Sequence, residues 1–460
     1  MDNVLQMSAL EQAKALRERE FSSEELTRFY LKRIEERNHK NNAFVRVFSN
    51  RALRQARKKD KLLRHGHTDE LSIYHGVPTG VKDLDTVRYS RIQFGSRMAR
   101  YGWSMTDGPV AKRMRQGGFV FLGKLATSEF GILPITETDL HPPCRNPWDL
   151  SVTAGGSSGG SASAVAAGML PIAQASDGGG SIRIPASLCH LFGFKPSRGL
   201  MPNFYLPAEY VGLSTVNCVS HTVEDSAAML DVLTLQKYDP RQPNPESLLF
   251  RCQKAPRSLR IGVWSEPILG EMHPEVMEAL QKTAKALEEL GHHVEEKPPE
   301  QATLEEFLPV WSGGITGIPI ISKSLVQPAT YWLHREGKKY KKEQVLARAE
   351  ELRGRIDRWF GQLDIIISPT IPVPPFQIGF SKELSGEEVF RQTAVFGAFT
   401  AIFNLGGHPA TSFPAGLSSQ NHPIGIQLAA KRGQDAQLLA LSKQLETAMP
   451  WVQRNILDCS

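Results

Sequence analysis

Two serine-glycine runs and one lysine carry the strongest chemical signal in this sequence of 460 residues. The runs are AGGSSGGSASAVAAG, residues 154–168, and SDGGGSIRIPAS, residues 176–187. The lysine is Lys82, which lies in GVPTGVKD, a short apolar segment bounded by glycine and proline. Burial disfavours the charged form of a lysine, so an amine in such a segment could act as a general base. These residues could therefore activate a serine hydroxyl as a nucleophile.

Three other interpretations of the glycine-rich runs each fail on particular residues. A phosphate-binding P-loop requires lysine at the position of Ser161. A dinucleotide-binding fingerprint that starts at Gly178 lacks its third glycine, because Arg183 occupies that position. Residues 155–159 match the G-x-S-x-G nucleophile elbow of α/β-hydrolases, but the preceding SVTAGG is too polar and small for the buried strand of an elbow.

Lys82 and the runs GGSSGGS and DGGGSIRIP together resemble the amidase signature family. The resemblance covers about residues 8–448 and includes GGFVFLGKLATSEFG, CRNPWDLS, LFGFKPSRG, SHTVEDSAAML and NLGGHPATSFPAG. It implies that Lys82 is the base, Ser157 the bridging serine of a cis peptide, and Ser181 the nucleophile, at spacings of 75 and 24 residues. The chain departs from the family pattern at Gly178, where a branched residue is more common, and at His190, where glycine is common.

The resemblance agrees with elementary chemistry. Ser157 can relay the proton of Ser181 to a neutral lysine, so no histidine is needed. Backbone N–H groups of Gly178, Gly179 and Gly180, together with that of Ser181, are expected to form an oxyanion hole.

The implied function is hydrolysis of an amide, or of a carbamate or ester, through an acyl-enzyme. Ile132 and Leu133, which follow SEFG, are expected to line the substrate pocket and to favour apolar acyl or aryl groups. Within the family, the chain looks more similar to bacterial enzymes that act on cyclic amide dimers, aryl amides and urethanes than to membrane-anchored members. The resemblance implies no cofactor or metal, and a monomer or homodimer. The alternative is a glutaminase similar to the glutamine-hydrolysing component of a tRNA-dependent amidotransferase.

Helices and strands must bring these residues together. Capping boxes at Ser8 and Ser22 predict two helices within residues 8–37, and a basic helix is expected at 51–64. Short apolar runs that end in glycine-rich turns, at 76–83, 117–124 and 168–180, predict buried strands, with helices between and after them at 159–168 and 221–235. Further along, the pattern predicts strands at 259–264, 292–296 and 364–368 and a helix at 274–290.

This alternation predicts one large α/β domain over residues 1–460, with a twisted mixed sheet of about ten or more strands covered by helices on both faces. Residues 8–70 would form N-terminal helices and residues 76–200 the catalytic core. The less regular segment 300–345, which mixes tryptophan, glycine, proline and the basic run REGKKYKK, is interpreted as a substrate-side flap or a surface excursion.

Composition narrows the class of protein. Hydrophobic residues at 41% and charged residues at 22% are typical of a soluble folded chain. Residues 159–175 are too short and polar for a membrane span, and the N-terminus has no apolar signal region, so a cytoplasmic location is expected. A net charge of +6 spread over the whole length does not favour nucleic acid. Five cysteines without C-x-x-C spacing are expected to be free thiols.

Overall fold

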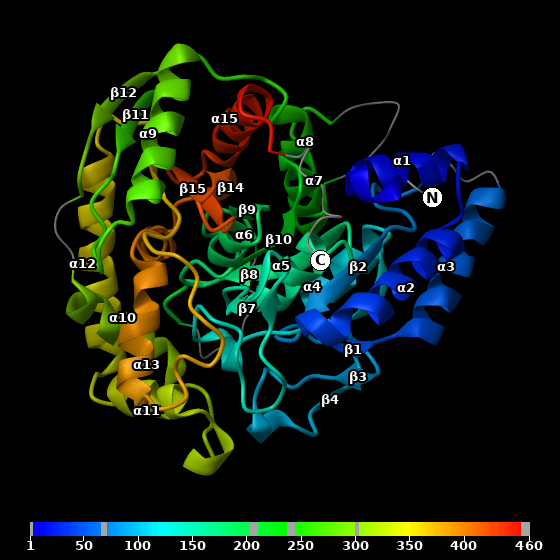
Figure 1. The fold of residues 1–460 in the computed structure, drawn as a ribbon, viewed down its shortest axis with the longest axis horizontal. Helices are drawn as coiled ribbons and strands as arrows, with labels where there is room; N and C mark the ends of the chain where they lie inside the picture. Colours follow the sequence, from blue (N-terminus) through cyan, green and yellow to red (C-terminus); the bar gives the residue numbers. More distant parts are fainter. Residues whose placement is uncertain (1–2, 66–70, 202–209, 237–243, 300–302, 452–460) are drawn as a thin grey trace.

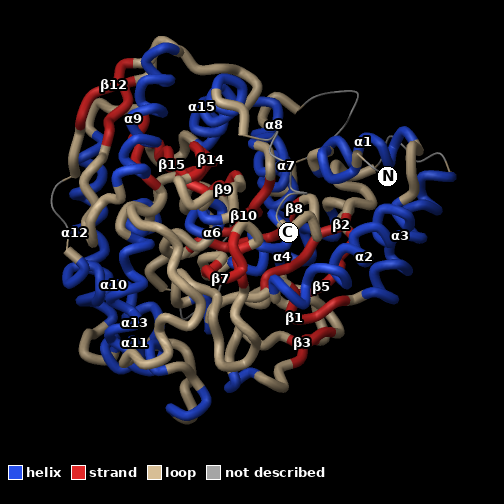
Figure 2. The backbone as a smooth tube through the Cα atoms, in the orientation of Figure 1, coloured by secondary structure: helices blue, strands red, loops and turns tan. Residues whose placement is uncertain are grey.

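An eleven-stranded mixed sheet runs through the molecule and carries helices on both faces (Figures 1 and 2). The computed structural model describes residues 3–65, 71–201, 210–236, 244–299 and 303–451. Within these ranges the strand order of the large sheet is β1-β5-β2-β8-β10-β9-β14-β15-β13-β11-β12. This architecture confirms the predicted α/β fold.

The strands of the large sheet are β1 (Phe44–Val47), β2 (Pro78–Lys82), β5 (Val120–Leu125), β8 (Ile172–Asp177), β9 (Phe192–Lys195), β10 (Thr215–Ser220), β11 (Arg260–Val263), β12 (His293–Glu296), β13 (Ile365–Pro369), β14 (Ala410–Leu417) and β15 (Pro423–Ala430). Two small sheets are formed by β3 (Ser90–Arg91) with β4 (Trp103–Ser104), and by β6 (Arg145–Asn146) with β7 (Asp149–Thr153).

The helices are α1 (Ala9–Glu18), α2 (Ser23–Asn41), α3 (Ser49–Arg64), α4 (Pro109–Gln116), α5 (Gly159–Ala166), α6 (Arg183–Leu188), α7 (Val223–Leu233), α8 (Leu248–Arg251), α9 (Pro274–Glu289), α10 (Leu304–Ile315), α11 (Pro328–Gly337), α12 (Lys342–Phe360), α13 (Gly386–Thr393), α14 (Ala401–Gly406) and α15 (Asp435–Ala448). No helix in the described part of the chain is long and apolar enough to cross a membrane.

The sheet combines parallel and antiparallel strands, which gives it separate halves. β2 pairs in parallel with β5 and β8, and β11 pairs in parallel with β12 and β13. The strands between these groups, from β8 through β15 to β13, pair antiparallel. The second serine run begins in β8, and the first contains α5, which packs against β8 and β2. Both runs therefore lie at the half of the sheet that contains β2 and β8.

Alternate residues of β13 show how both faces of the sheet are covered. Ile365 and Ile367 belong to the large core that contains α7, α9 and α15 side chains. Ile366 belongs to a second core, built largely from α12 and α14. Because successive side chains of a strand point to opposite faces, these two cores lie on the two sides of the sheet.

Most sequence-predicted elements are present, with ends shifted by a few residues. The capping boxes at Ser8 and Ser22 both form, and the basic helix extends over Ser49–Arg64. The segment 300–345 differs from its expected irregular texture: from residue 303 onward it contains α10, α11 and the start of α12, whereas 300–302 lie outside the described residues. A capping box at Thr303 and Glu306 starts α10, and its buried Leu304 and Leu308 anchor the helix.

A buried carboxylate joins α1 to α7, a helix that packs against β10 of the sheet. Asp225, on α7, accepts the backbone N–H groups of Ala9 at 3.0 Å and of Leu10 at 2.9 Å, in the first turn of α1. Its carboxylate thus satisfies helix donors that have no partner within α1 itself. The cysteines at 144, 189, 218 and 252 are buried and free, as expected, and Cys459 lies outside the described residues.

Candidate active site

Lys82 ends strand β2 in the buried interior, where three serine hydroxyls surround its amine. All five residues of β2 are buried, and the Lys82 N–H donates to Gln174 Oε1 of the neighbouring β8 at 2.8 Å. The amine Nζ lies 2.7 Å from Ser157 Oγ, 2.7 Å from Ser158 Oγ and 3.0 Å from Ser176 Oγ. Hydroxyls, rather than carboxylates, are therefore the direct hydrogen-bond partners of this amine.

The environment of Lys82 favours a neutral amine. Burial lowers the pKa of Lys82 to about 7, and the nearby carboxylates of Asp85 and Asp177 offset only part of that effect. Burial also raises the pKa of Asp85 to about 6. A neutral amine has a lone pair, so at and above neutral pH Lys82 can accept a proton.

The first serine run forms a tight turn into α5. The Gly156–Ser157 peptide bond is cis. The hydroxyl of Thr136 supports the turn from outside, donating to the Gly155 carbonyl at 2.8 Å and accepting the Gly159 N–H at 3.2 Å. Glycine is required at 156, because a side-chain carbon there would lie 2.7 Å from the backbone of Ile135.

The second serine run lies beside the first. The Ser158 N–H donates to the Ser181 carbonyl at 3.3 Å, so the two turns meet through their backbones. The side chains of Ser157 and Ser181 are 2% and 7% exposed, and Ser181 lines a pocket. Lys82, Ser157 and Ser181, predicted from far apart in the sequence, thus lie in one buried region with access from a single side.

Asp177 and Arg183 hold the loop that carries Ser181. The Arg183 guanidinium forms two contacts with the Asp177 carboxylate, at 2.9 and 3.0 Å, and both side chains are fully buried. Asn404 of α14 donates to the same carboxylate at 2.8 Å. Although burial opposes it, the Arg183 charge holds the pKa of Asp177 below its usual range. Neither side chain lines the pocket, and the pair orients the loop instead.

The same carboxylate changes the expected oxyanion hole. The Gly180 N–H donates to Asp177 Oδ1 at 2.7 Å, so this donor is already engaged. The N–H groups of Gly178, Gly179 and Ser181 make no hydrogen bond to any other described residue. These three donors remain available to a substrate oxygen, whereas Gly180 serves the turn, with a φ of +128° that suits glycine.

A largely apolar pocket opens at Ser181. Its empty volume, part of it open to solvent, is about 1080 Å³, a size suited to a small molecule. Of the two residues expected at the substrate pocket, Ile132 lines it and Leu133 does not; Leu133 is buried in the same apolar cluster as Ile132, and Pro134 lines the pocket instead. His190 does not line it and lies against the Trp148 ring, with centroids 5.2 Å apart.

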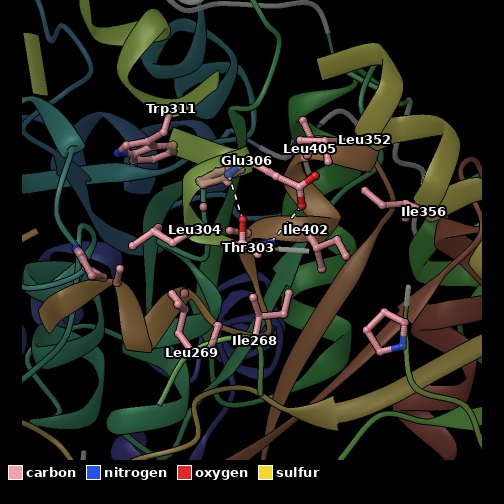
Figure 3. Close-up of a pocket in the computed structure, with 18 of the residues that line it drawn as sticks. Ile268, Leu269, Thr303, Leu304, Glu306, Trp311, Leu352, Ile356, Ile402 and Leu405 are labelled. Atoms are coloured by element: carbon pink, nitrogen blue, oxygen red, sulfur yellow. Dashed lines mark hydrogen bonds between the residues drawn. The ribbon is translucent and has the colours of Figure 1, made fainter. Parts of the chain in front are cut away.

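Much of the pocket wall comes from residues that sequence reasoning did not single out. Helices α10, α12 and α14 supply apolar side chains, among them Phe307. Trp311, Ile356 and Ile402 from the same helices are labelled in Figure 3. The indole N–H of Trp311 is buried without a hydrogen-bond partner among the described residues. The only sequence signal for α10 was the pair Thr303 and Glu306 before an apolar run, a capping-box pattern.

The fold and the buried group of one lysine and several serines are typical of a serine-dependent hydrolase, and comparison with known proteins identifies the family. The model of the Amidase family matches residues 25–315 and 318–439. The chain belongs to the amidase family.

Known relatives and solved structures are similar to this chain over nearly its full length. The chain is 33% identical to a 6-aminohexanoate-cyclic-dimer hydrolase of Pseudomonas sp. (strain NK87), covering 98% of this chain and 96% of that protein. It is 30% identical to an acylamidase of Rhodococcus erythropolis, covering 99% and 98%. The solved structure of a 6-aminohexanoate cyclic dimer hydrolase complexed with substrate superimposes with a TM-score of 0.87 at 30% identity, covering 99% of both chains. This chain is therefore an amidase, a hydrolase that acts on carbon–nitrogen bonds.

Proposed function

We propose that this amidase cleaves its substrate through Ser181 as the nucleophile, Ser157 as the proton relay and Lys82 as the base. The contact that carries the proposal is the 2.7 Å distance between Lys82 Nζ and Ser157 Oγ, in a buried site that lowers the pKa of the lysine to about 7. An ordinary serine hydroxyl is a weak nucleophile, and an adjacent base that removes its proton activates it.

The proposed reaction has two halves. Ser181 Oγ attacks the carbonyl carbon while its proton passes through Ser157 to Lys82, and N–H groups of Gly178, Gly179 and Ser181 stabilise the oxyanion. The carbon–nitrogen bond then breaks, and the same proton returns through the relay to the departing amine. Water next attacks the acyl-enzyme, passes its proton along the same route and releases the carboxylic acid and free Ser181.

The pocket indicates the class of substrate. Apart from Ser181, its described lining is apolar over most of its length, so an amide with an apolar acyl or aryl group fits it best. An amide substrate also agrees with the relatives, which are a 6-aminohexanoate-cyclic-dimer hydrolase and an acylamidase. Carbamates and esters present the same carbonyl to Ser181 and belong in the same substrate panel.

The role of Ser181 is tested by replacing each serine in turn. Ser181→Ala should abolish turnover of an aryl amide and covalent labelling by a fluorophosphonate, because both require the same nucleophile. Ser157→Ala should lower the labelling rate by about 10²–10⁴-fold without abolishing it, since it removes only the relay. Labelling that persists in Ser181→Ala and disappears in Ser157→Ala would reverse the two assignments.

The glutaminase alternative rests on one distant likeness. A glutamyl-tRNA(Gln) amidotransferase component from Thermotoga maritima superimposes with a TM-score of 0.76 at 26% identity, covering 97% of this chain and 96% of that chain. Because an apolar pocket offers little to the polar side chain of glutamine, we favour the amidase proposal. A stable complex with a second protein in a pull-down, accompanied by glutaminase activity that requires it, would support the alternative instead.

A further inference from the structure

The pocket at Ser181 is polar at two ends and apolar between them. One end contains Ser181 and Gly179, and a side-chain carbon added at Gly179 would lie 3.2 Å from the Trp311 ring. Within the described part of the chain, the other polar side chains that line the pocket are those of Thr303, Glu306 and Arg355, and Arg355 donates to Glu306 Oε1 at 2.8 Å. Trp311 thus marks the reactive end, and the Glu306–Arg355 ion pair marks the far end.

Helix α10 sets the distance between the two ends. Its lining residues Leu304, Phe307 and Trp311 follow an i, i+3, i+7 spacing, so they share one face of the helix. Thr303 caps the start of that helix and bonds to Glu306 there, as Figure 3 shows. Eight residues at about 1.5 Å each place Thr303 roughly 12 Å from Trp311 along the axis, which about nine or ten bonds of an extended alkyl chain would span.

The wall beside the Thr303–Glu306 end is apolar as well. Helix α12 contributes Leu352, Ile356 and Trp359, again on one face, and α14 contributes Ile402 and Leu405. Figure 3 shows Leu352, Ile356, Ile402 and Leu405 grouped near the Thr303–Glu306 end, away from Trp311. A polar group placed midway along this wall would lose hydration without gaining a partner, whereas methylene groups would gain burial.

We propose that this pocket selects substrates by length. It accepts one unbranched apolar arm of about nine or ten atoms, and the Glu306–Arg355 pair sets the maximum length of that arm. The inference rests on the amidase function proposed above and names its substrate class, amides with one medium-length alkyl arm. The arm belongs to the acyl or the amine side of the amide, and the experiment separates the two.

The first measurement is a chain-length series. We expect kcat/KM for linear amides to rise up to about three- to fourfold per added methylene until about nine or ten atoms, and then to level off or fall. Two series are compared, one lengthened on the acyl side and one on the amine side, and only one should show the rise. Binding of the same series to Ser181→Ala, measured by calorimetry, should show the same limit without turnover.

The second measurement tests whether a substitution at Arg355 changes the preferred arm length. Arg355→Met replaces the charge with an apolar side chain of similar length, so the optimum should shift to longer arms by two or more methylenes. Arg355→Lys should keep the original optimum. Arg348→Met is the matched control, because Arg348 pairs with the same Glu306 at 3.9 Å but does not line the pocket.

The outcomes separate the two proposals. Three results would each overturn the proposed selection by length and leave the amidase proposal intact. They are hydrolysis without any length optimum, an optimum that Arg355→Met does not move, and an equal shift of the optimum in Arg348→Met. If calorimetry shows a length limit but the unmodified protein hydrolyses no amide, the proposed selection by length is supported and the proposed function is overturned.

Discussion

At the scale of single residues, the proposed role of Lys82 as the base predicts that the activity depends on pH. A lysine base works only when neutral, and burial lowers the pKa of Lys82 to about 7. The neutral fraction grows as the pH rises through that value. We therefore expect kcat/KM on an amide to rise tenfold per pH unit below about pH 7 and to reach a plateau about one unit above it.

Replacing the amine tests this origin of the pH profile. Lys82→Ala should remove the rising limb and lower kcat/KM by about 10²–10⁴-fold. Activated esters should suffer less than amides, because their leaving group does not need the returning proton. His190→Gly, which changes a histidine outside the pocket, should keep the limb. An unchanged limb in a folded Lys82→Ala variant would contradict the assignment of Lys82 as base.

Sequence reasoning works best at this scale, where the spacing of a few residue types carries the information. The sequence singles out Lys82, Ser157 and Ser181, and the structure places them in one buried region. The sequence does not single out Ser176, which also contacts the Lys82 amine, because no pattern distinguishes this residue from an ordinary serine in a strand. The engaged N–H of Gly180 is likewise hidden, since it depends on the rotamer of Asp177.

At the scale of elements, the loop between β8 and α6 should tolerate a side chain at one glycine and not at another. A carbon added at Gly180 would lie 2.3 Å from Thr400 Oγ1, and its φ of +128° disfavours other residues. A carbon added at Gly178 would meet Ser214 Oγ at 3.1 Å, with an ordinary φ. The departure from the family pattern at Gly178 therefore lies at the more permissive position.

These contacts predict different outcomes for two alanine variants. Gly180→Ala should lower kcat by about 10²–10³-fold, because it displaces the neighbouring N–H groups that we propose as oxyanion donors. Gly178→Ala should stay within about threefold of the unmodified enzyme, an effect near 0.5 kcal/mol. Steady-state kinetics on one amide, with circular dichroism to confirm folding, measure both. Equal losses in the two variants would show that the loop is not held as described.

The sequence predicts a helix or strand well where neighbouring residues determine it. It predicts poorly those elements that depend on tertiary packing. The capping boxes of α1 and α2 are recognisable because both partners lie within four residues. Helix α10 is missed, since its segment contains an internal Pro309 and a glycine pair, which are typical of irregular structure. Its helical form is stabilised by burial against α11 and α12, information that a sequence pattern does not contain.

At the scale of the whole molecule, Asp225 of α7 links α1, at one end of the described chain, to an element more than 200 residues later. Its carboxylate is the buried acceptor for two N–H groups of α1, so Asp225→Ala should lower the free energy of unfolding by about 1–3 kcal/mol or more. Burial raises the pKa of Asp225 to about 7, so Asp225→Asn, which resembles the protonated form, should cost less.

Urea denaturation followed by circular dichroism measures this link. Glu11→Gln is the control, because Glu11 also bonds at the start of α1 but is exposed, and its effect should stay within about 0.5 kcal/mol. A loss in Asp225→Ala no larger than that of the control would show that α1 is held by its apolar face alone.

The residues that hold the nucleophile loop also determine when the enzyme can first become active. Arg183, two residues beyond Ser181, is held by Thr400, Asn404 and Gln427, which follow it by 217, 221 and 244 residues. During synthesis on the ribosome, the loop emerges long before these partners exist. Until β15 has been made, the nascent chain contains an unsupported nucleophile and an Asp177–Arg183 pair without its neighbours. We therefore expect chains that stop before β15 to hydrolyse no amide, and hydrolysis to begin only once β15 has been synthesised and has folded against the loop.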